Sequence, residues 1–506
     1  MNENVDVVIA GAGPVGLMLA CELRLAGVTV LVAEPRTEID PTLKAGAINL
    51  PTAQAFHRRG LLPALAERHA AGIARIARFV ASRGANAPAR LPGGHFAGLM
   101  LSRPDVDDDP DFAHAGPAGA VWFVSQQDIE EILGARAAEL GVDVRRGAAV
   151  TGFADDGTGV TVELGETRVR ARWLVGCDGG RSTVRKRAGF DFPGLDPEIT
   201  GRQAVAELRG ADALPAGWNA TPTGVFVHGP TPGRFLTVEL DGPPADRDAP
   251  VTARELQDSL RRVSGVEVEV GAVRSATRFT DNTRQVTDYR RGRVLLAGDA
   301  AHVHSPFGGQ GLNLGIGDAV NLGWKLAAVV HGHAGPDLLD TYTRERHPVG
   351  AWVLEWTRAQ IALMRLDPRS RALRAVVAEL VATPDGSAAI FKHIAGIRHR
   401  YDLGGAHPLV GAAAPHAALG ADVAGLFASG RAVLVGFTGG ADPAPVAGPW
   451  SDRLTIASVA TAGPDGITGL LIRPDGIVAW VGTSARTTGL PEALSRWCGP
   501  ARLPVV

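Results

Sequence analysis

Short runs of consecutive apolar residues recur through the first 300 positions of the chain. They are VDVVIA (5–10), VTVLVAE (28–34), ARWLVGC (171–177) and the VLLAGD stretch (294–299). Continuous apolar runs of this length are typical of parallel strands that are buried on both faces. Between the first two runs, an apolar helix pattern extends to Leu25 and Gly27 ends it. The pattern therefore predicts an α/β fold built on a buried parallel sheet.

The hydrophobic pattern changes twice along the rest of the chain. Residues 186–275 contain short alternating runs separated by proline and glycine turns, a pattern typical of antiparallel strands. Residues 336–400 are rich in Arg, Leu and Ala with a helical pattern, and from about His407 strand-like runs return before a closing helix, LPEALSRW. The helical region is a candidate brace or oligomer interface. Two or three domains are expected for 506 residues.

Charge and cysteine content narrow the class of protein. The chain carries 51 Lys and Arg against 53 Asp and Glu, a net charge of −2, without a block of like charge. A nucleic-acid tail or a polybasic membrane anchor is therefore not expected. The three cysteines are far apart and form no CxxC, and no apolar stretch of about 20 residues occurs. We expect a soluble cytoplasmic protein that binds a small molecule, with no nucleic-acid or membrane partner; a homo-oligomer remains open.

The first strand runs directly into GAGPVG, which matches the pattern of a dinucleotide-binding turn. In that pattern Gly11 permits the tight turn, Gly13 admits the pyrophosphate to the backbone, and Gly16 lets the helix pack on the strand. The helix N-terminus then offers free N–H groups to the phosphate. Glu34 ends the second strand, where a carboxylate accepts hydrogen bonds from a ribose. In a chain with 64 glycines the motif alone is weak, but its position between strand and helix favours an adenine dinucleotide.

Two further motifs follow buried strands in the same order as in a known family. They are DGGRS, with Asp178, Gly179, Arg181 and Ser182, and Gly298-Asp299 followed by HSPFGGQGLN. With GAGPVG and Glu34, they make residues 1–350 resemble the class A flavoprotein monooxygenases of the para-hydroxybenzoate hydroxylase type. The resemblance is greatest to the bacterial polyketide and phenol hydroxylases.

The resemblance implies non-covalent FAD, with NADPH or NADH as transient co-substrate and O2 as oxidant. Asp299 would bind the ribityl chain, and Gln126 would contact the same region, with its neighbour Gln127 as a register alternative. Backbone at Pro306, Gly308 and Gly309 would lie against the reactive face of the flavin, and no acid/base residue is assigned. The remaining expected cofactor contacts are Gly11, Gly13, Pro14, Val15, Gly16, Glu34, Pro35, Arg36, Lys44, Ala45, Asp178, Arg181, Gly298, Gly311, Leu312 and Asn313.

Some of these positions have simpler interpretations. Relatives usually carry an arginine where this chain has Lys44, and lysine keeps the charge but loses the bidentate fork. Asp178 and Asp299 could each cap a helix or a turn, although their placement after buried strands argues against this. His302 and His304 have no companion ligands at metal-binding spacing, so we interpret both as structural and expect no metal site.

The fold implied by the resemblance is a Rossmann-like FAD-binding domain of the glutathione-reductase type with two additions. Residues 1–75, 101–185 and 276–400 would form the discontinuous FAD-binding domain with its trailing helices. Residues 76–100 and 186–275 would form an inserted antiparallel-sheet substrate domain. Residues 401–506 would form a thioredoxin-like domain, which without CxxC cannot carry dithiol chemistry.

Three functions are compatible with these motifs. The first is NAD(P)H-dependent hydroxylation of a phenolic or polyketide-derived aromatic substrate through a flavin 4a-hydroperoxide, as the family performs it. The second is Baeyer–Villiger oxygenation of a polyketide by the same cofactor. The third is a flavin-binding or substrate-binding protein without turnover. A flavin halogenase is disfavoured because WxWxIP is absent from the sequence.

Overall fold

The four predicted apolar strands are neighbours in one sheet. The computed structural model describes residues 3–82, 93–101, 109–112, 115–119, 121–420, 422–483 and 487–502. In it the strands run parallel in the order β19-β10-β1-β2. Their bounds are Glu3–Ala10 for β1, Val30–Glu34 for β2, Thr167–Gly176 for β10 and Val294–Leu296 for β19. The expected α/β class and its buried parallel sheet are confirmed.

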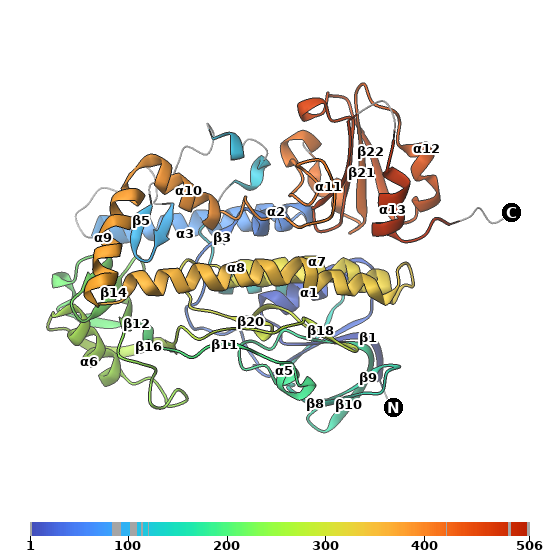
Figure 1. Ribbon diagram of the computed structural model, residues 1–506. Helices are drawn as coiled ribbons and strands as arrows, with labels where there is room; N and C mark the ends of the chain where they lie inside the picture. Colours follow the sequence, from blue (N-terminus) through green and yellow to red (C-terminus); the bar gives the residue numbers. More distant parts are fainter. Residues whose placement is uncertain are drawn as a thin grey trace.

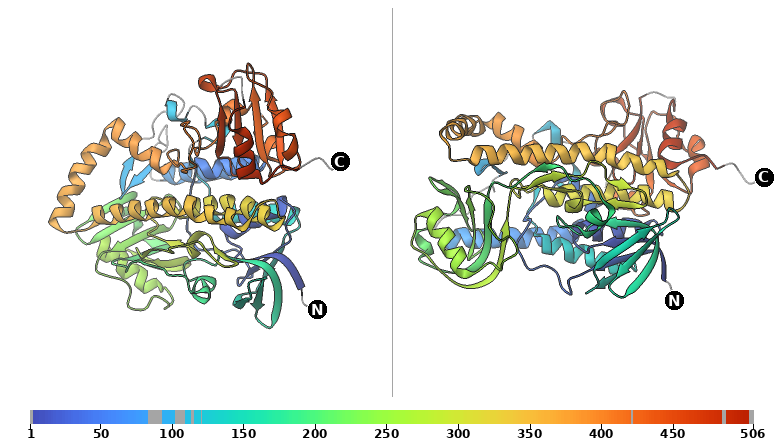
Figure 2. Two further views of the ribbon diagram at one scale, coloured as in Figure 1. Left: turned by 45° about the vertical axis from the view of Figure 1, so that its right-hand side comes forward. Right: turned by 60° about the horizontal axis from the view of Figure 1, so that its bottom comes forward.

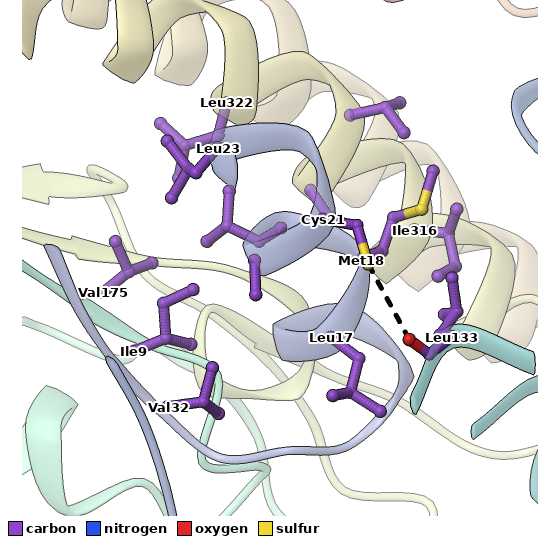
Figure 3. Packing of buried hydrophobic residues seen from close by; sticks show 14 of the residues in the cluster. Ile9, Leu17, Met18, Cys21, Leu23, Val32, Leu133, Val175, Ile316 and Leu322 are labelled. Carbon is purple, nitrogen blue, oxygen red and sulfur yellow. Dashed lines mark hydrogen bonds between the residues drawn. The ribbon is translucent and has the colours of Figure 1, made fainter. Parts of the chain in front are cut away.

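Helix α1 (Pro14–Leu25) covers this sheet and is itself covered by α4 (Gln126–Glu139) and α7 (Gly311–Val330). Figure 3 shows Ile9, Val32 and Val175 of three adjacent strands beneath α1. The sheet also holds strands that the apolar pattern did not indicate, because they are short or half-exposed. These are β7 (Asp143–Arg146), β8 (Val150–Asp155), β9 (Val160–Leu164) and β18 (Arg290–Arg291).

A second, antiparallel sheet lies at the opposite end of the molecule (Figure 1). Its order is β13 (Gly217–Thr221), β14 (Gly224–His228), β15 (Arg234–Glu239), β12 (Thr200–Arg209) and β16 (Glu269–Phe279). Helix α6 (Ala253–Ser264) packs on one face through a cluster that includes Phe226 and Phe235. Strand β16 pairs with β12 out to Phe279, past the predicted boundary at 275/276. Helix α3 (Leu62–Ser82) likewise runs unbroken through the predicted boundary at 75/76.

Long helices connect the parts of the molecule. Helix α8 (Asp340–Met364) lies alongside α7 through the middle of the molecule, and both helices extend toward the C-terminal region (Figures 1 and 2). Helices α9 (Pro368–Ala382) and α10 (Pro384–Ile394) follow and pack near a small hairpin, β4 (Gly94–Phe96) and β5 (Leu99–Leu101). Among the helices described, none has the length and hydropathy needed to cross a membrane.

The C-terminal region forms a mixed four-stranded sheet in the order β22-β21-β23-β24. One pairing, β21 with β22, is parallel and the other two are antiparallel, as expected for a thioredoxin-like arrangement. The strands span Ala432–Phe437, Leu454–Val459, Gly469–Ile472 and Val478–Gly482 for β21 to β24. Helix α13 (Leu490–Cys498) packs on this sheet, and its Cys498 is buried with its thiol pKa raised by burial to about 12.

Buried charges join this sheet to the long helices. Arg473, which follows β23, is 1% exposed and donates to both carboxylate oxygens of Glu345 on α8, at 2.9 and 2.7 Å. Lys325 on α7 lies 2.9 Å from the same carboxylate and also donates to Asn321. Burial works against ionisation, yet Arg473 and Lys325 outweigh it and hold the pKa of Glu345 at about 2. The C-terminal sheet is therefore attached to the helices by paired charge as well as by apolar packing.

Replacing Arg473 tests how much this attachment contributes. Arg473→Leu should lower the free energy of unfolding by about 3–5 kcal/mol, because removing one partner leaves a buried carboxylate undercompensated. Arg209→Leu is the matched control, since Arg209 is 80% exposed and pairs with an exposed Glu269. The control should cost less than about 1 kcal/mol. Urea unfolding of both variants measures the difference, and equal losses would show that the buried cluster adds no stability.

Candidate cofactor and substrate site

One cavity of about 1240 Å³ extends from the glycine turn after β1 to the antiparallel sheet. Of the predicted site residues, all except Gly16 and Gly298 line it. The cavity therefore brings together three motifs that lie up to 300 positions apart in sequence. It has a polar part beside the parallel sheet and an apolar part beneath β12, β14 and β15.

The three glycines of the first turn differ in what surrounds them. A side chain on Gly11 or Gly16 would collide with backbone, since an added Cβ would lie 2.4 Å from the Cys177 carbonyl oxygen or 2.0 Å from that of Gly11. An added Cβ on Gly13 meets no atom within 4 Å, and this empty space faces the cavity. Gly11 and Gly16 are therefore required by the fold, whereas Gly13 leaves room for a ligand.

Glu34 is held in a fixed orientation at the end of β2. Its Oε2 accepts from the Ala12 N–H at 2.8 Å and its Oε1 from the Arg36 N–H at 2.9 Å. Each oxygen keeps a free lone pair toward the cavity that Glu34 lines. The carboxylate is thus oriented to accept hydrogen bonds from a ribose diol.

The two motif aspartates have different roles. Asp178 accepts from the Ser182 hydroxyl and from the N–H groups of Thr183 and Val184 at 2.7 and 3.1 Å, so its carboxylate caps helix α5 (Thr183–Ala188). Asp299 is exposed to the cavity and makes no hydrogen bond or ion pair with any described residue. The capping interpretation thus describes Asp178, whereas Asp299 remains available for a ligand.

The predicted cationic contacts are occupied by protein carboxylates. Lys44 Nζ lies 2.9 Å from Asp40 Oδ2, and Arg36 lies 2.7 Å from the same oxygen. Burial of Asp40 is outweighed by hydrogen bonds from Lys44 and Thr42, which hold its pKa at about 2. Arg181 forms an ion pair with Asp248 and is 63% exposed. Contact of Lys44 or Arg181 with a pyrophosphate stays a prediction that requires these pairs to open.

Gln126 and Gln127 both line the cavity, and each is tied to protein. Gln126 Nε2 donates to Glu130 at 2.9 Å, while Gln127 Nε2 donates to the Thr42 carbonyl at 2.7 Å. Each side chain keeps its amide oxygen as a free acceptor. The ribityl contact expected of Gln126 therefore stays a prediction.

The N-terminus of α7 opens into the cavity beside Pro306–Gly309. Gln310 precedes this 20-residue helix without a side-chain cap, so the first-turn N–H groups are free for a ligand. Asn313 is held by protein instead: its Oδ1 accepts from the Asn49 N–H and the Thr52 hydroxyl, and its Nδ2 donates to the Gly309 carbonyl. Gly309 has φ +63° and open space at its Cβ position. A flat ring could therefore lie against this backbone.

Sequence reasoning missed Asp318, the residue that fixes the Gly298-Asp299 turn. Asp318 is 0% exposed and accepts from the Gly298 N–H at 3.0 Å, from His302 Nε2 at 2.7 Å and from Arg346 Nε at 2.8 Å. His302 is thereby structural, as expected, and His304 donates from Nδ1 to the Ser305 carbonyl while its ring reaches the cavity. The signal in the sequence was polar Asp318, Asn321 and Lys325 on one face of an otherwise apolar helix.

The apolar part of the cavity is lined mainly by Trp218, Val227, Leu236, Phe279 and Phe307. Three other large aromatic residues, Phe226, Phe235 and Tyr289, do not line the cavity and are core residues less than 3% exposed. Polar side chains that line the cavity near these residues include His95, Gln203, Arg234 and Thr277. An apolar pocket with a few polar groups is the usual form of a small-molecule site.

Comparison with known families agrees with this geometry. A family model described as an FAD binding domain matches residues 4–357, and one described as the C-terminal region of aromatic-ring hydroxylases matches residues 407–501. The chain belongs to the FAD-dependent aromatic-ring hydroxylases, the class A flavoprotein monooxygenases.

Individual relatives cover almost the whole chain. A 12-dehydrotetracycline 5-monooxygenase/anhydrotetracycline 6-monooxygenase of Streptomyces rimosus is 41% identical over 98% of this chain and 99% of the relative. A rifampicin monooxygenase of Streptomyces venezuelae is 40% identical over 98% and 99%. The solved structure of OxyS anhydrotetracycline hydroxylase from Streptomyces rimosus has a TM-score of 0.85 at 40% identity, over 98% and 100%. A dialkyldecalin synthase of Streptomyces rugosporus is also similar, at 38% identity over 98% and 99%.

The residues present fit FAD. The empty space at Gly13, the braced Glu34 carboxylate, the Asp299 carboxylate and the uncapped α7 N-terminus all face a single cavity. They offer, in turn, room for a pyrophosphate, acceptors for ribose and ribityl hydroxyls, and N–H donors for an anionic ring edge.

Two glycine variants distinguish a glycine that the fold requires from one that leaves room for the ligand. Gly13→Val should leave the free energy of unfolding of the apoprotein within about 1 kcal/mol of the wild-type value, because an added Cβ there meets no protein atom within 4 Å. It should nevertheless abolish FAD binding by filling the space for the pyrophosphate. Gly16→Ala should instead destabilise the apoprotein itself. FAD content after purification and thermal unfolding give both readouts, and full FAD occupancy in Gly13→Val would contradict this assignment.

Asp299→Ala should weaken FAD binding by at least about tenfold, because a charge-assisted hydrogen bond contributes about 1.5–3 kcal/mol. Asp299→Asn keeps the shape and one acceptor, so its loss should be smaller. Titration of apoprotein with FAD, followed by flavin fluorescence, compares the two. Unchanged affinity in Asp299→Ala would show that this carboxylate does not hold the cofactor.

Proposed function

We propose that the protein hydroxylates a flat, oxygenated polycyclic aromatic substrate of polyketide type, using FAD, NAD(P)H and O2. The observation that carries the proposal is the continuity of the cavity. Its cofactor part and its apolar part adjoin at Pro306–Gly309, so a flavin ring and an aromatic substrate would meet there. Relatives named as anhydrotetracycline and rifampicin monooxygenases support a large oxygenated substrate.

Bound FAD would carry electrons from NAD(P)H to O2 and deliver one oxygen atom to the substrate. The α7 N-terminus would stabilise negative charge on the reduced ring through its dipole and free N–H groups. Trp218, Phe279 and Phe307 would surround the substrate, since the Phe307 ring lies 5.9 Å from Trp218 and 6.0 Å from Phe279. These rings would also exclude water from the reacting face, and water exclusion protects reactive oxygen species from wasteful loss.

A second candidate function is cyclisation of a bound substrate without net oxidation. It is favoured by the dialkyldecalin synthase relative and by a solved Diels-Alderase, PyrE3, with a TM-score of 0.78 at 35% identity. In that case FAD would be retained without NAD(P)H turnover. Baeyer–Villiger oxygenation, in contrast, would consume NAD(P)H but insert the oxygen into a ring bond.

Labelled O2 distinguishes these functions. With an accepted phenolic polycycle, NAD(P)H oxidation should rise well above its basal rate and one labelled atom should appear as a new hydroxyl group. Mass spectrometry counts the labelled atoms, and NMR of the product tells a hydroxyl from an inserted ring oxygen. A changed product without NAD(P)H consumption would favour the cyclase.

Gly309→Asn tests whether the flavin-face backbone protects the reaction. Asn tolerates the left-handed conformation of Gly309, so the fold should persist while the side chain enters the cavity. NAD(P)H oxidation should then continue while the share released as hydrogen peroxide increases. Peroxide yield per NAD(P)H measures this uncoupling, and a wild-type yield would show that position 309 does not face the reaction.

A further inference from the structure

The β4–β5 hairpin places one imidazole in the apolar part of the cavity. His95 lies on β4, and its ring contacts Trp218 with a centroid distance of 4.1 Å. Trp218 in turn contacts Phe307, so His95 lies one aromatic ring away from the flavin-face segment. The side chain is partly exposed, and it lines the cavity.

The hydrogen bonding of His95 determines its tautomer. Its Nδ1 is 3.3 Å from the backbone N of Gly98, and an N–H group can only donate, so Nδ1 is the acceptor. A neutral imidazole carries one N–H, which must then be on Nε2. The described residues provide no partner for Nε2, and the ring lies in the cavity lining.

Burial favours the neutral form of the His95 imidazole. Burial lowers the pKa of His95 to about 4, and no carboxylate among the described residues offsets this effect. His95 is therefore suited to donate a hydrogen bond without bringing a charge into an apolar pocket. Burying a cation there would cost far more than burying a neutral donor.

The turn that follows His95 is held firmly in place. Ala97 N–H donates to Gln360 Oε1 at 3.0 Å, and the Ala97 carbonyl accepts from Arg374 at 2.7 Å. Gln360, which is fully buried on α8, also donates from Nε2 to the Phe307 carbonyl at 3.2 Å. One side chain thus fixes the hairpin relative to the flavin-face segment.

We propose that His95 is a substrate-binding residue that donates from Nε2 to a phenol or quinone-type carbonyl oxygen of the polycyclic substrate. This hydrogen bond orients the ring system against Trp218 and Phe307 and selects substrates with an acceptor oxygen at that edge. The inference rests on the proposed function for the class of substrate, and it concerns binding rather than oxygen transfer.

Two variants distinguish the contribution of the His95 N–H donor from that of its aromatic ring. His95→Phe keeps a ring against Trp218 but removes the N–H, whereas His95→Gln keeps an N–H donor near the position of Nε2. The probe is 1,8-dihydroxyanthraquinone, a flat polycycle with phenol and carbonyl oxygens, titrated into the FAD-loaded protein and followed by flavin absorbance. His95→Phe should weaken binding by up to about tenfold, and His95→Gln should restore most of it.

Equal affinity in all three proteins would overturn the inference, and so would a wild type that does not bind the probe. Nitrogen-15 NMR of the holoprotein provides a test that does not depend on folded variants: His95 should be the neutral Nε2–H tautomer at neutral pH. A charged ring or the Nδ1–H tautomer would also overturn it. If the variants lose binding as expected while labelled oxygen is never incorporated, the donor role stands and the monooxygenase proposal fails.

Discussion

The site depends on one buried carboxylate. Asp318 accepts hydrogen bonds from the Gly298 N–H, His302 and Arg346, and thereby joins the Gly298-Asp299 turn to α7 and α8. Burial opposes its charge, but Arg346 and His302 outweigh that effect and keep its pKa below the usual value. Because Asp318 fixes the turn, the Asp299 carboxylate can face the cavity without a hydrogen bond or ion pair to any described residue. The buried ion cluster around Asp318 thus fixes the turn, and the neighbouring Asp299 carboxylate stays available for a ligand.

The same network connects the C-terminal sheet, which has no CxxC, to the long helices. Arg346 also donates to the Tyr401 hydroxyl at 3.0 Å, and Tyr401 lies beside Arg473, whose guanidinium packs over Trp497 at 4.7 Å. Charged and aromatic groups thus run continuously from the C-terminal sheet to the helix whose N-terminus opens into the cavity. The C-terminal sheet therefore holds α7 and α8 in position through these contacts.

The sequence predicted the parts of this protein that depend on local pattern. The four apolar strands, the glycine turn and the trailing helices were all indicated by runs of a few residues. The ion pair of Asp318 with Arg346 could not be foreseen, because the two residues lie 28 positions apart in sequence. Asp40 and Lys44 are only four positions apart, but they lie in a loop, where that spacing does not predict a pair. Asp178 shows the same limit, since its capping of α5 competes with the ligand role suggested by the motif. His95 was missed because its three-residue strand has no periodicity to detect.

Gln360 has a mechanical consequence. Its amide bonds the Ala97 N–H on one side and the Phe307 carbonyl on the other, and it is fully enclosed by protein. The substrate-side hairpin and the backbone beside the flavin therefore cannot move independently without breaking one of two buried hydrogen bonds. A molecule that displaces the hairpin must therefore either break one of these buried hydrogen bonds or move the Phe307 backbone with it.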